Sequence, residues 1–394
     1  MKKLTKLLPE WSDIIYKGLN YDETETYRTI RHIFRSLWSY YAIMNGNFES
    51  NVKKENIKSL QKGLEKVFRF QSDYFPLLLL YHDIGRPFNR EWHTLESAEI
   101  VQQRKMFQSF HLSPIQEVIL TGVIRHHLLP GTIFTGESSY FGAISLYNDE
   151  SLQDVWLSYE NIDILFHTLM VFTIIDIWGY DYSKIYDHYF SHYIQIRDNL
   201  IRVFANIDSI EEEEHQINLY QEFSKIDKPN LKWRVACALR IFQFVNTQSY
   251  LKEEFYFAKI DEGLSDKNQN WKEFSSSLGN EHSLIQFKYA LPIMMVLASG
   301  NFVRKPFDSE EKIFPGIFDF WQTCTNIVKS SDKNPILNTK NYPILWNFIF
   351  NLPRGWFFQS KQVKYVLSDK FLNNITKTSI EFNTEMDSYM VNIK

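Results

Sequence analysis

A histidine and an aspartate stand side by side, as His82 and Asp83, at the end of the apolar run Leu77–Tyr81. Both side chains are metal ligands, and burying them without a partner would cost several kcal/mol of lost hydration. Neutral imidazole and ionised carboxylate together suit Zn, Mn, Fe and similar divalent ions. The doublet therefore predicts a metal site. The alternative is a helix that breaks at Gly85, with His82 capping its last carbonyls.

Further residues of the same two types lie on or beside apolar helical segments. His32 lies at the margin of a helical face marked by Ile30 and Ile33. Asp176 lies within the apolar stretch 162–178, where a carboxylate needs a cation or several hydrogen bonds. The remaining candidates are His93, His126 and His127. Each alone is more often structural, but several helices that deliver imidazole and carboxylate to one core build the metal sites of helical bundles.

The order of these residues along the chain resembles that of the HD superfamily of metal-dependent phosphohydrolases. The resemblance covers about residues 27–185, under half of the chain, and is strongest from His82 to Pro87 and from His93 to Ile100. It implies one metal ion held by His32, His82, Asp83 and Asp176. It further implies a second ion, with His93, His126 and His127 as the added ligands and Asp83 bridging. The metal, whether Mn, Fe, Co, Ni, Mg or Zn, is left open.

The resemblance implies that a metal-activated hydroxide cleaves a phosphate ester, with a nucleotide or cyclic nucleotide as the leading substrate class. Asp83, His93 and Arg86 are the expected catalytic residues. Arg86 and Arg125 are candidates for contacting phosphate, unless each is a surface arginine paired with a local carboxylate. Glu137 lies in the polar loop after the paired histidines and could contact substrate, although an ordinary turn explains it as well.

Two other functional classes fit the same residues. The HD architecture also hosts di-iron oxygenases, which the ligand set alone does not separate from hydrolases. A scaffold that binds a nucleotide or a partner without turnover is the second alternative. The apparent completeness of the ligand set argues against that scaffold, because a decayed site usually lacks at least one ligand.

The chain's composition favours long helices. It has 394 residues, of which 44% are hydrophobic, 23% charged, and only 12 proline and 14 glycine. These proportions are typical of a globular protein with few turns. We predict an all-α fold, with an HD-type helical domain over residues 1–205 and a helical accessory domain of unknown role over residues 206–394. In the second half, aromatic clusters at 314–321 and 345–350 show helical spacing and are interpreted as core rather than a base-stacking surface.

The net charge bears on the class of partner, and the cysteine content bears on the cellular compartment. A net charge of -4 argues against broad binding to a nucleic-acid backbone, so the expected partner is a small-molecule phosphate ester. Cys237 and Cys324 offer no disulfide framework, which favours the cytoplasm. The segment 162–179 has the apolar length of a membrane helix, but Asp163 and Asp176 within it would be costly in lipid. We therefore predict no membrane association, and the oligomeric state stays open.

Overall fold

The computed structural model describes most of the first half of the chain and short pieces of the second. The described residues are 8–50, 52–71, 74–90, 92–135, 140–180, 185, 187–206, 218–219, 222–223, 226, 253–277, 286–288, 318, 322, 347–350, 380–383 and 388–391. The chain divides into two compact units. The first comprises Met1–Gly131 and Ala143–Ile210, and the second Thr132–Gly142 and Glu211–Lys394. The predicted boundary at residue 205 stays a prediction.

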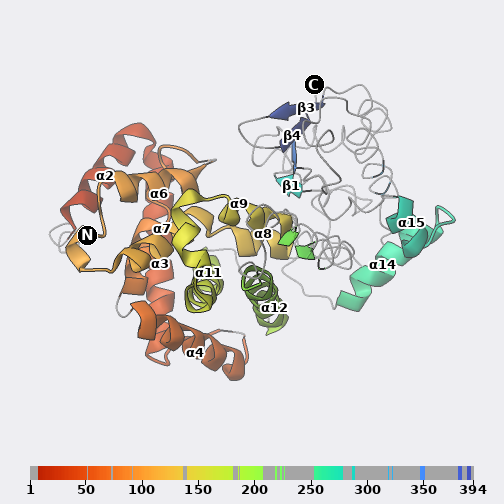
Figure 1. Cartoon of the computed structure of the whole chain (residues 1–394), viewed down its shortest axis with the longest axis horizontal. Helices are drawn as coiled ribbons and strands as arrows, with labels where there is room; N and C mark the ends of the chain where they lie inside the picture. Colours follow the sequence, from red (N-terminus) through yellow and green to blue (C-terminus); the bar gives the residue numbers. More distant parts are fainter. Residues whose placement is uncertain are drawn as a thin grey trace. The chain divides into compact units, whose positions relative to one another are not determined.

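The described residues up to 206 form helices and turns only (Figure 1). The α-helices are α2 (Pro9–Tyr21), α3 (Glu23–Met44), α4 (Lys54–Gln71), α5 (Phe75–Tyr81), α6 (His93–Gln103), α7 (Pro114–His126), α8 (Leu129–Thr135), α9 (Ile144–Tyr147), α10 (Gln153–Trp156), α11 (Tyr159–Trp178) and α12 (Asp187–Phe204). Short 3-10 turns lie at η2 (Gln108–Phe110), η3 (Tyr140–Ala143) and η4 (Glu150–Leu152). The predicted all-α fold class is confirmed for this part of the chain.

Helix α11 forms the centre of the first unit. It is apolar around most of its circumference, and it contacts α3, α4, α7, α10 and α12. A helix that is hydrophobic on all sides belongs inside a core or a membrane. By length and composition alone α11 could cross a membrane, but 72% of its most apolar window is buried within the protein. Its one buried carboxylate, Asp176, lies near its C-terminal end.

Local sequence signals define where the site-bearing helices begin. The Asp22 carboxylate accepts a hydrogen bond from the Glu25 amide at 2.9 Å and caps α3. Ser113 and Gln116 form a reciprocal capping box at the start of α7. These caps fix the residues at which α3 and α7, two of the helices that carry candidate ligands, begin.

Gly85 brings the turn after the His82-Asp83 doublet against the start of α6. Its amide donates to the Ser97 hydroxyl at 2.9 Å. A Cβ at this position would lie 2.5 Å from the backbone nitrogen of Ser97, so only glycine permits the approach. The close packing places the doublet beside His93, the first residue of α6.

The second unit combines helix and sheet in its described residues. It contains α14 (Glu253–Ser265), α15 (Trp271–Ser277) and the strands β1 (Gln286–Lys288), β2 (Asn347–Phe350), β3 (Ile380–Asn383) and β4 (Ser388–Val391). The strand order is β1-β2-β4-β3, with only the β3–β4 pair antiparallel. The sequence predicted helices alone in this half. The strand β2 lies in the aromatic cluster 345–350, and a short aromatic run suits a strand as well as a buried helix.

Candidate metal centre

Six of the seven predicted ligands converge in the core of the first unit. They come from α3, from the turn after α5, from the start of α6, from the end of α7 and from α11. None is more than 6% exposed. The six are His32, His82, Asp83, His93, His127 and Asp176. Their candidate ligand atoms form three overlapping groups, each within 4.8 Å.

The first part of the cluster is a tight triangle of ligand atoms. His32 Nε2 lies 2.7 Å from Asp176 Oδ1 and 3.1 Å from His82 Nε2. The third side, from His82 Nε2 to Asp176 Oδ1, is 3.0 Å. Ligands bound at about 2.1 Å from one ion and about 90° apart are separated by roughly 3 Å. The triangle therefore fits three ligands of a single divalent ion.

Asp83 lies between this triangle and a second pair of histidines. Its Oδ2 is 3.9 Å from His32 Nε2 and 3.7 Å from His82 Nε2. Its Oδ1 faces the other way, 3.2 Å from His93 Nε2 and 3.8 Å from His127 Nε2. This buried Oδ1 accepts no hydrogen bond from any described residue. The two oxygens are thus placed as a carboxylate that bridges two ions would be.

The histidine tautomers suit metal binding. His82, His93 and His127 each donate Nδ1–H to the carbonyl three residues earlier in the chain. The acceptors are Leu79, Arg90 and Ile124, at 3.0, 3.1 and 2.8 Å. In the neutral ring the proton then lies on Nδ1 and the lone pair on Nε2. The three lone pairs point at carboxylate oxygens, an arrangement that a cation between them would stabilise. The donor set therefore fits a divalent metal.

Electrostatics hold the Asp83 carboxylate ionised and the His127 imidazole neutral, the states in which each can bind a metal. Burial opposes charge on Asp83, but His82, His93 and Arg86 together hold the pKa of that carboxyl well below its usual value. Burial lowers the pKa of His127 to about 3, so this imidazole is neutral. For His82 burial acts in the same direction, but Asp83 and Asp176 outweigh it and raise the pKa. The centre therefore attracts positive charge.

The structure corrects the predictions for His126 and Arg125. His126 Nε2 lies 3.0 Å from Asp149 Oδ2, and Arg125 Nη1 donates to Asp149 Oδ1 at 3.1 Å. Consecutive residues of a helix point about 100° apart, so only one of the paired histidines can face the centre. That residue is His127. Asp149 was not predicted, and Glu137 lies outside the described residues.

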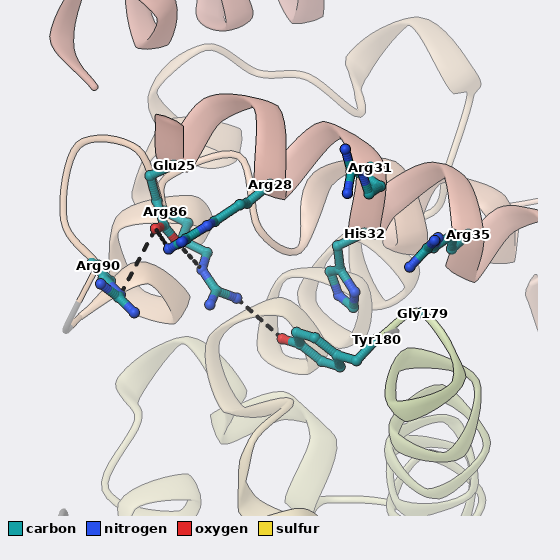
Figure 2. Close-up of a pocket in the computed structure, with 9 residues that line it drawn as sticks. All are labelled: Glu25, Arg28, Arg31, His32, Arg35, Arg86, Arg90, Gly179 and Tyr180. Atoms are coloured by element: carbon teal, nitrogen blue, oxygen red, sulfur yellow. Dashed lines mark hydrogen bonds and ion pairs between the residues drawn. The ribbon is translucent and has the colours of Figure 1, made fainter. Parts of the chain in front are cut away.

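The cluster opens through His32 onto a pocket of 380 Å³. Among the described residues its lining is strongly cationic, with five arginines and one carboxylate (Figure 2). The lining residues are Glu25, Arg28, Arg31, His32, Arg35, Arg86, Arg90, Gly179 and Tyr180. Of the arginines only Arg86 was predicted from the sequence. Three of the others could have been found from the sequence, because residues 28, 31, 32 and 35 share one face of α3.

Arg86 joins the pocket to the metal centre. Its Nη1 donates to Asp83 Oδ2 at 3.0 Å and to the Tyr180 hydroxyl at 3.1 Å. Its Nε donates to Glu25 Oε1 at 2.7 Å. The ring of Tyr180 stacks on His32 with centroids 4.1 Å apart (Figure 2). These contacts orient the Asp83 carboxylate and the His32 imidazole from the pocket side.

Gly179 sets the position of His32, which leads to a first prediction. A Cβ at Gly179 would lie 2.1 Å from Ser36 Oγ and 2.6 Å from His32 Nδ1. Gly179→Ala should therefore displace the imidazole and weaken metal binding by roughly 10-fold or more, as loss of a ligand's support does. Titration against a competing chelator measures this. Gly131→Ala is the control, because among the residues that the structure describes its Cβ would meet only Thr173 Cγ2, at 3.9 Å. Equal affinities in the two variants would contradict the prediction.

Comparison of the chain with protein-family models, with curated proteins and with solved structures gives no match. The resemblance to the HD superfamily therefore rests on the order and setting of the residues quoted above.

Proposed function

We propose that the protein is a metal-dependent phosphohydrolase that cleaves a phosphate ester of a small molecule, with nucleotides as the leading substrate class. One observation carries the proposal: His32 belongs both to the buried His/Asp cluster and to the wall of the arginine pocket. A centre that can hold divalent ions and a pocket suited to phosphate oxygens thus share a residue. Arginine is well suited to such oxygens because its guanidinium donates paired hydrogen bonds.

The cluster would hold two ions. One would be bound by His32, His82, Asp83 and Asp176, and the second by Asp83, His93 and His127. Divalent ions in such a site lower the pKa of bound water toward neutrality and neutralise charge on the phosphoryl oxygens.

Arg86 orients the Asp83 carboxylate from the pocket side and helps His82 and His93 to keep it ionised. Its side chain lines the pocket and is 14% exposed. The positive charge is therefore partly desolvated, and electrostatic interactions in such a setting are stronger than in water. A phosphoryl group approaching His32 from the pocket would meet this charge before it reached the buried carboxylates.

The experiment is a turnover assay on protein stripped with a chelator and then reloaded. Separate samples receive Mn²⁺, Co²⁺, Ni²⁺, Mg²⁺ or Fe²⁺, and release of phosphate or of nucleoside monophosphate is followed over a nucleotide panel. We expect turnover with at least one metal and none in the stripped protein. Oxygen consumption with Fe²⁺ and no phosphate release would contradict the proposal in favour of an oxygenase. Absence of turnover with every metal would contradict it in favour of a binding scaffold.

A further inference from the structure

We propose that Tyr180 is a positioning residue of the metal centre, with separate roles for its two parts. Its ring holds the His32 imidazole in the orientation that a metal ligand needs, and its hydroxyl holds Arg86 against Asp83. The inference deepens the proposed function and rests on it for the presence of a metal ion. Neither role was predicted from the sequence, in which Tyr180 is the second residue after the apolar stretch 162–178.

The His32 imidazole lacks the hydrogen bond that fixes the other rings of the cluster. His82, His93 and His127 each donate Nδ1–H to a backbone carbonyl. His32 Nδ1 is buried and has no hydrogen-bond partner among the described residues. A neutral imidazole without such a bond can carry its proton on either nitrogen, and its rotation about the Cβ–Cγ bond is only broadly restricted. Another contact must therefore keep His32 Nε2 beside Asp176.

The ring of Tyr180 supplies that contact. It lies against the imidazole of His32, with the ring centroids 4.1 Å apart and the planes at 25° (Figure 2). Rings stacked this closely are in van der Waals contact, so turning the imidazole would drive its edge into the tyrosine ring. The backbone of Gly179 closes the edge that carries Nδ1, because a Cβ there would lie 2.6 Å from this atom. Two consecutive residues thus enclose one candidate ligand.

The place of Tyr180 in the chain links two candidate ligands. Helix α11 ends at Trp178, two residues before Tyr180, and it carries Asp176. His32 Nε2 lies 2.7 Å from Asp176 Oδ1. The end of α11 would therefore supply one ligand of the triangle and hold a second one, from α3, against it.

The hydroxyl of Tyr180 acts on a different candidate ligand. It accepts a hydrogen bond from Arg86 Nη1 at 3.1 Å, and the same nitrogen donates to Asp83 Oδ2 at 3.0 Å. Arg86 has another anchor, because its Nε donates to Glu25 Oε1 at 2.7 Å. Removing the hydroxyl alone should therefore disturb Asp83 less than removing the ring disturbs His32.

Substitution separates the two parts of the side chain. The probe is Co²⁺, whose affinity for the full chain is measured by competition with a chelator. Tyr180→Phe keeps the ring and should keep the wild-type affinity. Tyr180→Leu removes the ring and should lower the affinity by about 10-fold or more, as loss of a group that orients a ligand does. In a His32→Ala background the leucine substitution should have no further effect, because the imidazole that the ring holds is gone.

Tyr193→Leu is the matched control. Tyr193 lies on α12 and is 1% exposed, but it belongs neither to the cluster nor to the lining of the pocket. Its substitution should lower the midpoint of thermal unfolding and leave the Co²⁺ affinity unchanged. The visible absorption of bound Co²⁺ reports the geometry of its ligands, and the bands of Tyr180→Phe should match those of the wild type.

Three results would overturn the inference. They are a Tyr180→Phe affinity about 10-fold below that of the wild type, equal affinities in Tyr180→Leu and Tyr193→Leu, and a full further loss when Tyr180→Leu is added to His32→Ala. Tyr180→Phe removes one hydroxyl and keeps the shape of the ring, so the first result decides even where the leucine variant does not fold.

Because metal binding rather than hydrolysis is measured, the outcomes separate the two proposals. Loss of Co²⁺ affinity in Tyr180→Leu, from a protein that turns over no ester, would contradict the proposed function alone. Phosphate release from esters by a protein whose Co²⁺ affinity is the same in the wild type and in Tyr180→Leu would contradict the inference alone.

Discussion

Asp83→Ala is expected to remove both metal ions and lower turnover by about 1000-fold or more, while the helical circular dichroism stays unchanged. The two oxygens of Asp83 face both ligand groups, so its loss would remove a ligand from each of the two proposed ions. Several kcal/mol of transition-state stabilisation come from such ions, and about 1.4 kcal/mol corresponds to 10-fold in rate. Metal content is measured by mass spectrometry and turnover by phosphate release.

Two further variants make this result specific to the site. Asp83→Asn retains the shape of the side chain and removes its charge, and should lose metal as the alanine variant does. Asp198→Ala removes a carboxylate that is 58% exposed on α12 and should retain both metal and activity. Wild-type metal content in both Asp83 variants would show that this carboxylate does not bridge two ions.

The second prediction contrasts two neighbouring histidines. His127→Ala should lower the metal content by about one ion per chain, because His127, Asp83 and His93 are the ligands of the second proposed ion. His126→Ala should keep both ions, because its ring is bonded to Asp149 instead. The two variants remove the same chemical group from adjacent positions at the end of α7, so each controls for the other. Metal stoichiometry after dialysis is the measurement.

His126→Ala should instead affect stability. Removing the imidazole leaves the largely buried Asp149 with one partner fewer, which typically costs about 1–3 kcal/mol. Thermal unfolding followed by circular dichroism should show a lower midpoint. Loss of one ion in the His126 variant, with full metal content in the His127 variant, would reverse the assignment.

The residues of the His/Asp cluster could be singled out from the sequence because of their surroundings. Asp176 and the His82-Asp83 doublet lie in apolar stretches, where a charge or an imidazole needs a partner. The choice between His126 and His127 could not be predicted in the same way, since both follow the same apolar helix. It depends on the rotation of α7 relative to α11, which contacts among distant segments determine.

The arginine pocket could be predicted only in part. The row of Arg28, Arg31 and Arg35 is visible as helical spacing on one face of α3. Its opposite wall comes from Arg86 and Arg90 on a loop and from Tyr180 after α11, and no local pattern joins these segments. The strands of the second unit are short, and the residues that form them carry no period long enough to separate strand from helix.

The most direct test of the central claim is the metal content of the wild-type chain. The protein is reloaded with one divalent metal at a time, dialysed, and analysed by mass spectrometry against protein concentration. Two ions per chain, both absent from Asp83→Ala, is the result we predict. A wild-type chain that retains no more metal than Asp83→Ala, with every ion tried, would contradict a metal centre at this cluster.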